Sequence, residues 1–160
     1  MSIAVGDRIP DVELHTMSKE GPKAVRSGDV LGKGRVVLFA VPGAFTPTCS
    51  DYHLPGFLLR ADELKEKGVD TVACLSVNDP FVMGAWGKDR KVDGRVLMLA
   101  DGNGTFTKEV GLEMDGSAVG LGTRSRRYAA VLDDGVVTAL FVEEKPGLDV
   151  SSAESVLATL

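Results

Sequence analysis

A short apolar run that stops abruptly is the feature that most constrains the fold of this chain. Residues 35–41 (RVVLFAV) are mostly β-branched, aliphatic or aromatic, and Pro42-Gly43 follows them directly. A run of this length with such a stop indicates a buried strand. Pro47 is disfavoured inside a helix but suits a helix start, so we expect a helix to begin near Thr48. The sequence therefore predicts a junction between a buried strand and a helix.

Cys49 falls in the first turn of that predicted helix. Unpaired backbone N–H groups and the helix dipole favour an anion there, so a thiol in this position becomes a thiolate more readily. A lone cysteine is more often a small buried hydrophobe, which is the competing interpretation. The neighbouring prolines, glycine and threonines favour instead a loop shaped around the sulfur. The hydroxyls of Thr46 and Thr48 can hold a polar substrate or cap the helix.

The remainder of the chain predicts alternating strands and helices, without a repeat or a linker. Pro55-Gly56 should interrupt or kink the helix after Cys49. Asp134-Gly135 is a strong hairpin signal, and Ser151-x-x-Glu154 reads as a capping box that opens a final helix ending at Leu160. Further strands are expected at 70–77, 96–100, 127–132 and 136–142, and further helices at 57–67, 80–91 and 104–110.

Charge and composition exclude several classes of function. The net charge of −5 argues against general nucleic-acid binding and against a cationic membrane face. No apolar run approaches the ~20 residues that a membrane span needs. Residues 1–10 lack the features of a signal or transit peptide, so we expect a cytoplasmic location. A location in an organelle is the alternative, because a transit peptide removed before residue 1 would leave no trace in this sequence. Two cysteines form no disulfide framework for 160 residues, which favours a reducing compartment.

The spacing Pro42-x-x-x-Thr46-x-x-Cys49 resembles the active-site motif of the peroxiredoxins, which are thiol peroxidases of thioredoxin-like fold. The strings at 42–50 (PGAFTPTCS) and 53–57 (HLPGF) are similar to the type II, or peroxiredoxin-5-like, subfamily. This resemblance implies an α/β thioredoxin-like sandwich, with a central mixed β-sheet flanked by helices, as one domain over residues 1–160. The similarity continues through residues 73–83, 85–87, 120–128 and 151–154.

The resemblance also implies an activity. It indicates a glutaredoxin- or thioredoxin-dependent peroxidase that reduces hydrogen peroxide and organic (alkyl) hydroperoxides through a Cys49 thiolate and sulfenic acid cycle. Such an enzyme has an antioxidant role in cell redox homeostasis, acts as a homodimer and needs no metal or organic cofactor. Glutaredoxin with glutathione, or thioredoxin, would recycle it. The alternative is a non-enzymatic redox sensor that relays Cys49 oxidation to a partner protein. A disulfide oxidoreductase would need a second cysteine where Tyr52 stands.

The same resemblance assigns catalytic roles to Pro42, Thr46, Cys49 and Arg127. Peroxide reduction needs a deprotonated sulfur, groups that hold the peroxide in line, and positive charge for the leaving oxygen. An arginine suits the last task because it stays charged and presents its donors in a fixed fork. Since side chains alternate along a strand, at most one of Arg126 and Arg127 can face the site.

The sequence assigns no specific catalytic role to the other polar and aromatic residues near the motif. We expect Arg124 and Arg126 to belong to a solvated basic turn. His53 should share a helix face with Cys49, but no third orienting group is evident, so we interpret it as a supporting polar residue rather than a general base. Trp86 is expected to pack near the site as part of the core.

The role of Cys74 is open. Its mid-strand position is typical of an inert buried thiol. In some proteins that the chain resembles, a cysteine here is proposed to resolve the oxidised catalytic cysteine; others carry a resolving cysteine near the C-terminus, where residues 147–152 contain none. A Cys49–Cys74 disulfide and direct resolution by an external thiol are the two routes. We favour the external thiol, because cysteines on neighbouring elements can lie too far apart to bridge.

Overall fold

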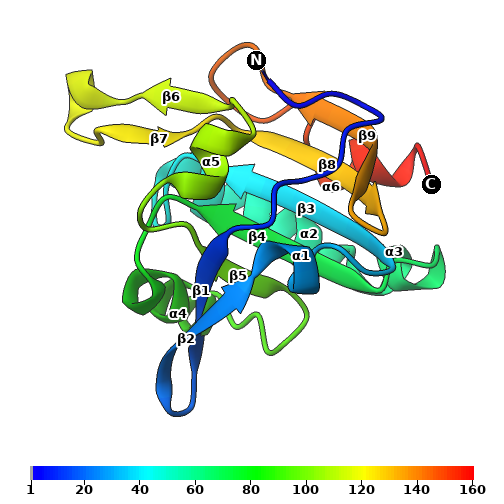
Figure 1. The fold of residues 1–160 in the computed structure, drawn as a ribbon, viewed down its shortest axis with the longest axis horizontal. Helices are drawn as coiled ribbons and strands as arrows, with labels where there is room; N and C mark the ends of the chain where they lie inside the picture. Colours follow the sequence, from blue (N-terminus) through cyan, green and yellow to red (C-terminus); the bar gives the residue numbers. More distant parts are fainter. Residues whose placement is uncertain (1) are drawn as a thin grey trace.

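The computed structural model describes residues 2–160 and is built on a mixed sheet of seven strands in the order β2-β1-β5-β4-β3-β8-β9 (Figure 1). The centre is parallel, because β3 pairs with β4 and β4 pairs with β5 in that sense. The outer pairings, β1 with β2 and β5, and β8 with β3 and β9, are antiparallel. The strands are β1 (Glu13–Ser18), β2 (Gly21–Arg26), β3 (Arg35–Val41), β4 (Thr71–Ser76), β5 (Leu97–Ala100), β8 (Tyr128–Asp133) and β9 (Val136–Val142).

Helices cover both faces of this sheet, which explains why β3 is apolar without alternation. Alternate residues of β3 contribute to two separate apolar clusters, with Phe39 in one and Leu38 in the other. The Phe39 side is covered by α2 (Leu54–Leu59), α3 (Ala61–Glu66), α4 (Pro80–Asp89) and α6 (Ala153–Leu157). The opposite side is covered by α1 (Ser27–Val30) and α5 (Thr105–Glu109).

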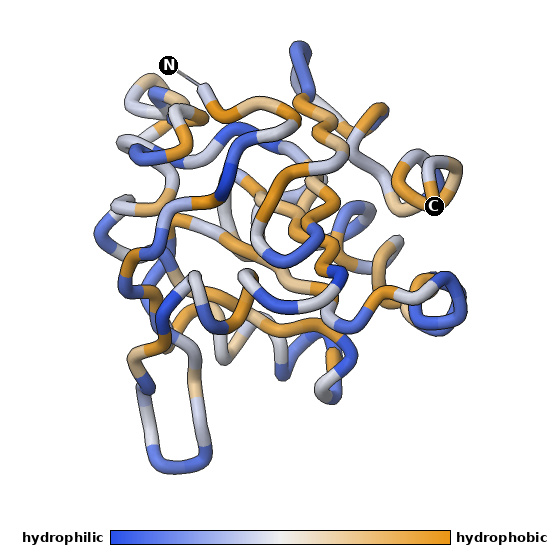
Figure 2. Tube along the Cα trace, turned by 45° about the vertical axis from the view of Figure 1, so that its right-hand side comes forward, coloured by the Kyte–Doolittle hydropathy of each residue, from blue (hydrophilic) through white to orange (hydrophobic). Residues whose placement is uncertain are grey.

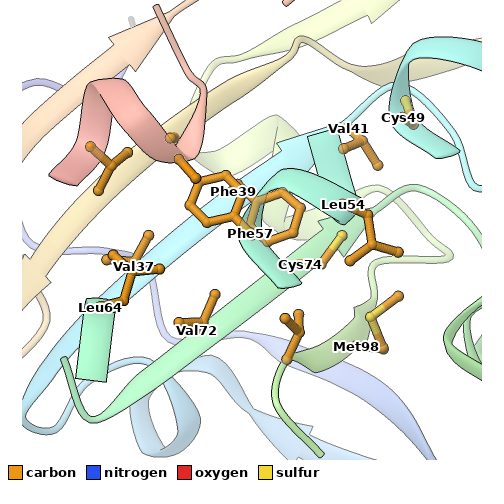
Figure 3. Close-up of a cluster of buried hydrophobic side chains, with 14 of the residues drawn as sticks. Val37, Phe39, Val41, Cys49, Leu54, Phe57, Leu64, Val72, Cys74 and Met98 are labelled. Carbon is orange, nitrogen blue, oxygen red and sulfur yellow. The ribbon is translucent and has the colours of Figure 1, made fainter. Parts of the chain in front are cut away.

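The cluster on the Phe39 side lies directly beside the predicted reactive segment. Phe39 and Phe57 stack with ring centroids 4.2 Å apart, which joins the sheet to α2 (Figure 3). Cys49 and Cys74 belong to this cluster as well. The chain trace agrees with this arrangement, because hydrophobic segments run through the interior and the tip of the β1–β2 hairpin is hydrophilic (Figure 2).

Two hairpins were not expected from the sequence. The β1–β2 hairpin lies at one edge of the main sheet, and β6 (Glu113–Asp115) pairs with β7 (Thr123–Ser125) in a separate two-stranded sheet; both project from the body (Figure 1). Their strands carry little hydrophobic alternation, since β2 contains glycine, proline and lysine and is mostly exposed. Sequence periodicity is weak for such edge strands.

The predicted start of the last helix needs correction. Ser152, not Ser151, caps α6, because its hydroxyl accepts the N–H of Ser155 at 3.2 Å. Ser151 is engaged elsewhere: its N–H and its hydroxyl both donate to the Glu143 carboxylate. The helix also ends at Leu157 rather than at the last residue. Within residues 2–160, no helix combines the length and the apolar character that crossing a bilayer requires.

Candidate active site

The loop between β3 and the next helix makes a tight turn. The N–H and the hydroxyl of Thr46 both donate to the Gly43 carbonyl, at 3.4 and 2.7 Å. Phe45, inside this turn, has a φ of 65°, a left-handed conformation that is uncommon for a bulky residue. A Cβ at Gly43 would lie 2.7 Å from Nη1 of Arg124, so only glycine fits without displacement. The turn therefore fixes where Thr46 points.

Arg124 and Asn78 anchor this loop from outside. Arg124 donates to the carbonyls of Pro42 and Leu121, at 3.1 and 3.0 Å. Asn78, just after β4, accepts the N–H of Ala44 at 3.0 Å. The expectation that Arg124 is merely solvated is therefore wrong: it is half-buried and bonded to the backbone. These contacts could not be predicted from the sequence, because the partners of Arg124 are distant backbone carbonyls.

Arg126 also departs from that expectation. It is half-buried, and its Nη2 donates to the Glu143 carbonyl at 3.1 Å. The cluster of three arginines is thus not a solvated turn. Two of its members hold backbone segments, and Arg127 contacts a cysteine.

Cys49 opens a π-helical segment, Cys49–His53, that continues into α2. The wide turn is closed by the N–H of Leu54, which donates to the Cys49 carbonyl. Pro55 has no N–H to offer, and it lies where the helix changes from π to α rather than at a break. The helix is interrupted only at Arg60, between α2 and α3. Such π-turns are rare and occur often at functional sites.

The Cys49 thiol is buried and contacts a guanidinium. Nη2 of Arg127 donates to Sγ of Cys49 at 3.1 Å. Arg127 is 8% exposed and lies directly before β8. A fixed cation at this distance stabilises negative charge that develops on an oxygen beside the sulfur.

His53 is packed against the same arginine and is fully engaged. Its Nδ1 lies 3.0 Å from Nη1 of Arg127, and its Nε2 lies 2.9 Å from the carbonyl of Ser151. Burial, followed by the positive charge of Arg127, lowers the pKa of His53 to about 3. The imidazole is therefore neutral at physiological pH. With Nδ1 occupied by Arg127, it has no free lone pair with which to deprotonate Cys49.

Trp86 lies beneath the site and is hydrogen-bonded to it. Its indole N–H donates to the hydroxyl of Ser50 at 2.9 Å, which ties α4 to the segment that begins with Cys49. The ring centroids of Trp86 and Phe45 are 6.4 Å apart. Trp86 is thus a core residue in contact with the reactive segment, and its contact with Ser50 could not be read from the sequence.

A cavity of about 500 Å³ lies over the motif. Its wall includes Pro42, Thr46 and Arg127, the apolar side chains of Met114 and Leu121, and residues 143–147. Cys49 is buried, and its sulfur contacts Arg127, which is part of this wall. A small molecule in the cavity would therefore meet the hydroxyl of Thr46 and the guanidinium of Arg127 beside the sulfur.

Cys74 lies on β4, in the same apolar cluster as Cys49 but on a different element, and Figure 3 shows the two side chains apart. Both cysteines are free thiols. Burial raises the pKa of the Cys74 thiol well above its usual value, and the nearby Cys49 raises it further. Cys74 is therefore a protonated, poorly nucleophilic thiol. Among residues 2–160, no group of three or more potential metal ligands comes together.

This chain is similar to redoxin-family proteins and to peroxiredoxins along nearly its whole length. A family model described as Redoxin matches residues 4–157. Peroxiredoxin-2B of Arabidopsis thaliana is 50% identical over 159 residues, covering 99% of this chain and 98% of the relative. The chloroplastic Peroxiredoxin-2E of the same plant is 50% identical over 163 residues, covering 99% of this chain and 70% of the relative. The crystal structure of reduced Prx3 from Vibrio vulnificus in complex with H2O2 is 51% identical, with a TM-score of 0.93 and 98% of each chain covered.

A buried thiol beside a guanidinium, where a central strand of a mixed and helix-covered sheet ends, defines a thiol-based redox enzyme of thioredoxin-like fold. The chain belongs to the Redoxin family and, within it, to the type II peroxiredoxins, which are thiol peroxidases. The predicted fold class and the predicted activity are both confirmed. The alternative of a non-enzymatic redox sensor is not favoured.

Proposed function

We propose that Cys49 is the sulfur that attacks the peroxide, with Pro42, Thr46 and Arg127 forming the catalytic site around it. The observation that carries this proposal is the 3.1 Å contact from the Arg127 guanidinium to the Cys49 sulfur, beside a cavity lined by Pro42 and Thr46. Among residues 2–160 no arginine or lysine donates a hydrogen bond to the Cys74 sulfur, and burial raises the pKa of its thiol and keeps it protonated. The substrates are hydrogen peroxide and alkyl hydroperoxides.

In the first step the Cys49 thiolate attacks one peroxide oxygen in line with the O–O bond. An S–O bond forms, the O–O bond breaks, and the second oxygen leaves with both electrons of that bond as an alkoxide or hydroxide. Sulfur is oxidised to a sulfenic acid, and the peroxide is reduced to an alcohol or water once the leaving oxygen gains a proton. Arg127 stabilises the charge that develops on this oxygen.

Thr46 and Pro42 hold the substrate in place. The hydroxyl proton of Thr46 is donated to Gly43, so its oxygen presents lone pairs to the cavity and can accept the O–H of a peroxide. Pro42 closes one side of the cavity with an apolar ring that shields the reacting atoms from water. A peroxide held by Thr46 and Arg127 is in position for attack by Cys49.

An external thiol completes the cycle. It attacks the Cys49 sulfenic acid, forms a mixed disulfide and releases water. A second thiol then attacks the external sulfur of this mixed disulfide, so that the bond to Cys49 breaks, Cys49 is released as the reduced thiol, and the two external thiols leave joined as a disulfide. Glutathione with glutaredoxin supplies these thiols, and thioredoxin is the second candidate. Direct attack by Cys74 is less favourable, because its thiol is buried and protonated. In this proposal the enzyme works as a homodimer, on the strength of the family resemblance, and in the cytoplasm, because its two free cysteines suit a reducing compartment.

Turnover with each reductant tests the recycling route. Peroxide consumption is measured for the wild type, Cys74→Ser and Cys49→Ser, first with glutaredoxin and glutathione and then with thioredoxin. Cys74→Ser is expected to turn over normally with glutaredoxin and glutathione, and Cys49→Ser with neither system. Loss of turnover of Cys74→Ser with both systems would make Cys74 an obligatory resolving cysteine. Turnover of Cys49→Ser would contradict the whole assignment.

A further inference from the structure

Three groups of this chain form a continuous hydrogen-bonded line behind the cysteine. The Ser151 carbonyl meets Nε2 of His53 at 2.9 Å, and Nδ1 of His53 meets Nη1 of Arg127 at 3.0 Å. Nη2 of the same guanidinium meets Sγ of Cys49 at 3.1 Å. His53 and Arg127 are both buried, so neither bond competes with bulk water.

The donor and the acceptor of each hydrogen bond in this line follow from the chemistry of the groups at its two ends. A carbonyl oxygen accepts and cannot donate, so Nε2 of His53 must carry the proton that it shares with Ser151. A guanidinium donates and cannot accept, so Nδ1 must be the bare nitrogen that faces Arg127. The ring is therefore neutral and held in the Nε2–H tautomer. Both of its nitrogens are satisfied, and each has a single partner.

We propose that His53 is a positioning residue, whose Nδ1 lone pair, fixed by the Ser151 carbonyl at Nε2, aims the Arg127 guanidinium at Cys49. This inference rests on the proposed role of Arg127. A guanidinium is planar and rigid, so holding one terminal nitrogen at Nδ1 directs the other terminal nitrogen at the sulfur. Phe39 and Phe57, with centroids 4.9 and 5.6 Å from the imidazole, fix the plane of the ring.

The line begins at the segment that follows β9. The carboxylate of Glu143 accepts the N–H of Asp149 at 2.8 Å, and the N–H and hydroxyl of Ser151 at 2.9 and 2.7 Å. Glu143 therefore closes residues 143–151 into a loop and sets the place of the Ser151 carbonyl. In this way the C-terminal segment fixes the geometry around a sulfur that belongs to the opposite half of the chain.

Three replacements of His53 separate this role from simple packing. His53→Asn keeps an oxygen acceptor near the position of Nδ1, while His53→Gln keeps an amide N–H donor near Nε2 but offers Arg127 no acceptor at the δ position. His53→Leu has neither. The measurement is the rate of Cys49 oxidation by hydrogen peroxide in a single turnover, with the melting temperature recorded beside it. His15, on β1 and paired with Glu13, supplies control variants with the same three replacements.

We expect His53→Asn to retain most of the oxidation rate. His53→Gln and His53→Leu should lose roughly tenfold or more, on the scale of one lost hydrogen bond to a charged group. The His15 variants should match the wild type. Equal rates in His53→Gln and His53→Asn, or rates that follow the melting temperature alone, would overturn the proposal. If Arg127→Lys is slow but His53→Gln is not, this inference fails alone; if neither is slow, the proposed role of Arg127 fails as well.

A spectroscopic measurement on the wild type needs no variant to fold. The 15N chemical shifts of the His53 imidazole report directly which nitrogen carries the proton. The structure requires a protonated Nε2 and a bare Nδ1 across about pH 5 to pH 8, the range in which a free histidine titrates. An imidazolium, or a proton on Nδ1, would overturn the proposal.

Discussion

Arg127 and Cys49 are 78 positions apart in the sequence, yet Nη2 of one lies 3.1 Å from Sγ of the other. The sheet creates this contact. Arg127 directly precedes β8, Cys49 follows the end of β3, and these strands pair so that Ala40 lies opposite Tyr128. The register between β3 and β8 therefore places the Arg127 guanidinium beside the Cys49 thiol.

Replacing this cation with a lysine should slow the enzyme. Arg127→Lys keeps the positive charge but loses the fork that contacts Cys49 and His53 together. We expect the rate of peroxide reduction to fall roughly a hundredfold, the scale measured when one donor to a developing oxyanion is removed. Arg95→Lys, at an exposed arginine that donates to the carbonyls of Lys91 and Val92, is the matched control and should be unaffected. A full rate in Arg127→Lys would contradict the proposed role of the fork.

The contact between Trp86 and Ser50 should stabilise the segment that carries Cys49. Trp86→Phe removes the indole N–H and leaves the buried Ser50 hydroxyl without this donor, at a cost of about 1–3 kcal/mol in the free energy of unfolding. Adding Ser50→Ala should cost less than the sum of the two single changes. Urea unfolding of both single variants and the double variant measures this coupling, and strictly additive losses would show that the bond contributes nothing.

A buried neutral histidine predicts a direction for the pH dependence of stability. The pKa of His53 is about 3 in the folded chain, below its ordinary value of 6.5. Between these values the unfolded chain binds a proton that the folded chain does not, so stability is fully present above 6.5 and falls as the pH drops toward 3. This group alone contributes a slope of up to about 1.4 kcal/mol per pH unit.

The measurement compares the wild type with His53→Asn by urea unfolding from about pH 7 to about pH 4. Hydrogen bonds from residues 149–151 outweigh burial and lower the pKa of Glu143, so stability also falls at low pH in the variant. The difference between the two curves isolates His53. The variant should lose less stability than the wild type across this range, and parallel curves would show that His53 is not the group involved.

Two glycines make a matched pair for the geometry of the loop. A Cβ at Gly43 would approach Nη1 of Arg124 to 2.7 Å and Thr46 to 3.1 Å, whereas a Cβ at Gly56 in α2 meets nothing within 4 Å. Gly43→Ala should displace Thr46 and lower the rate of peroxide reduction, while Gly56→Ala should stabilise the helix by about 0.5–1 kcal/mol at full activity. Equal activity of the two variants would show that the loop does not need a glycine.

The sequence predicted most reliably what depends on neighbouring residues. The apolar run of β3 and the Asp134-Gly135 hairpin were recognised, as was the helix that begins at Pro80. These features arise from local propensity and a few turn residues, so they can be predicted from the sequence. The β1–β2 and β6–β7 hairpins were missed, because exposed edge strands need no apolar pattern.

The site was predictable in its parts but not in its connections. The Pro/Thr/Cys spacing drew attention to Cys49, and strand alternation limited Arg126 and Arg127 to one candidate. The hydrogen-bond partners of two other residues at the site were not predicted. Arg124 donates to the Pro42 carbonyl, and Nε2 of His53 bonds to the Ser151 carbonyl. A backbone carbonyl has no sequence signature, and which carbonyl is near depends on the whole fold. Neither contact could therefore be predicted from the sequence.

The role of Cys49 as the attacking sulfur can be tested by finding which cysteine receives the first oxygen. The reduced enzyme is treated with one equivalent of hydrogen peroxide and then with a reagent that traps sulfenic acids, and peptide mass mapping identifies the modified cysteine. We predict one trapped oxygen on Cys49, an unmodified Cys74, and a second oxygen on Cys49, as the sulfinic acid, when peroxide is in excess. A sulfenic acid on Cys74, with Cys49 left reduced, would contradict this prediction.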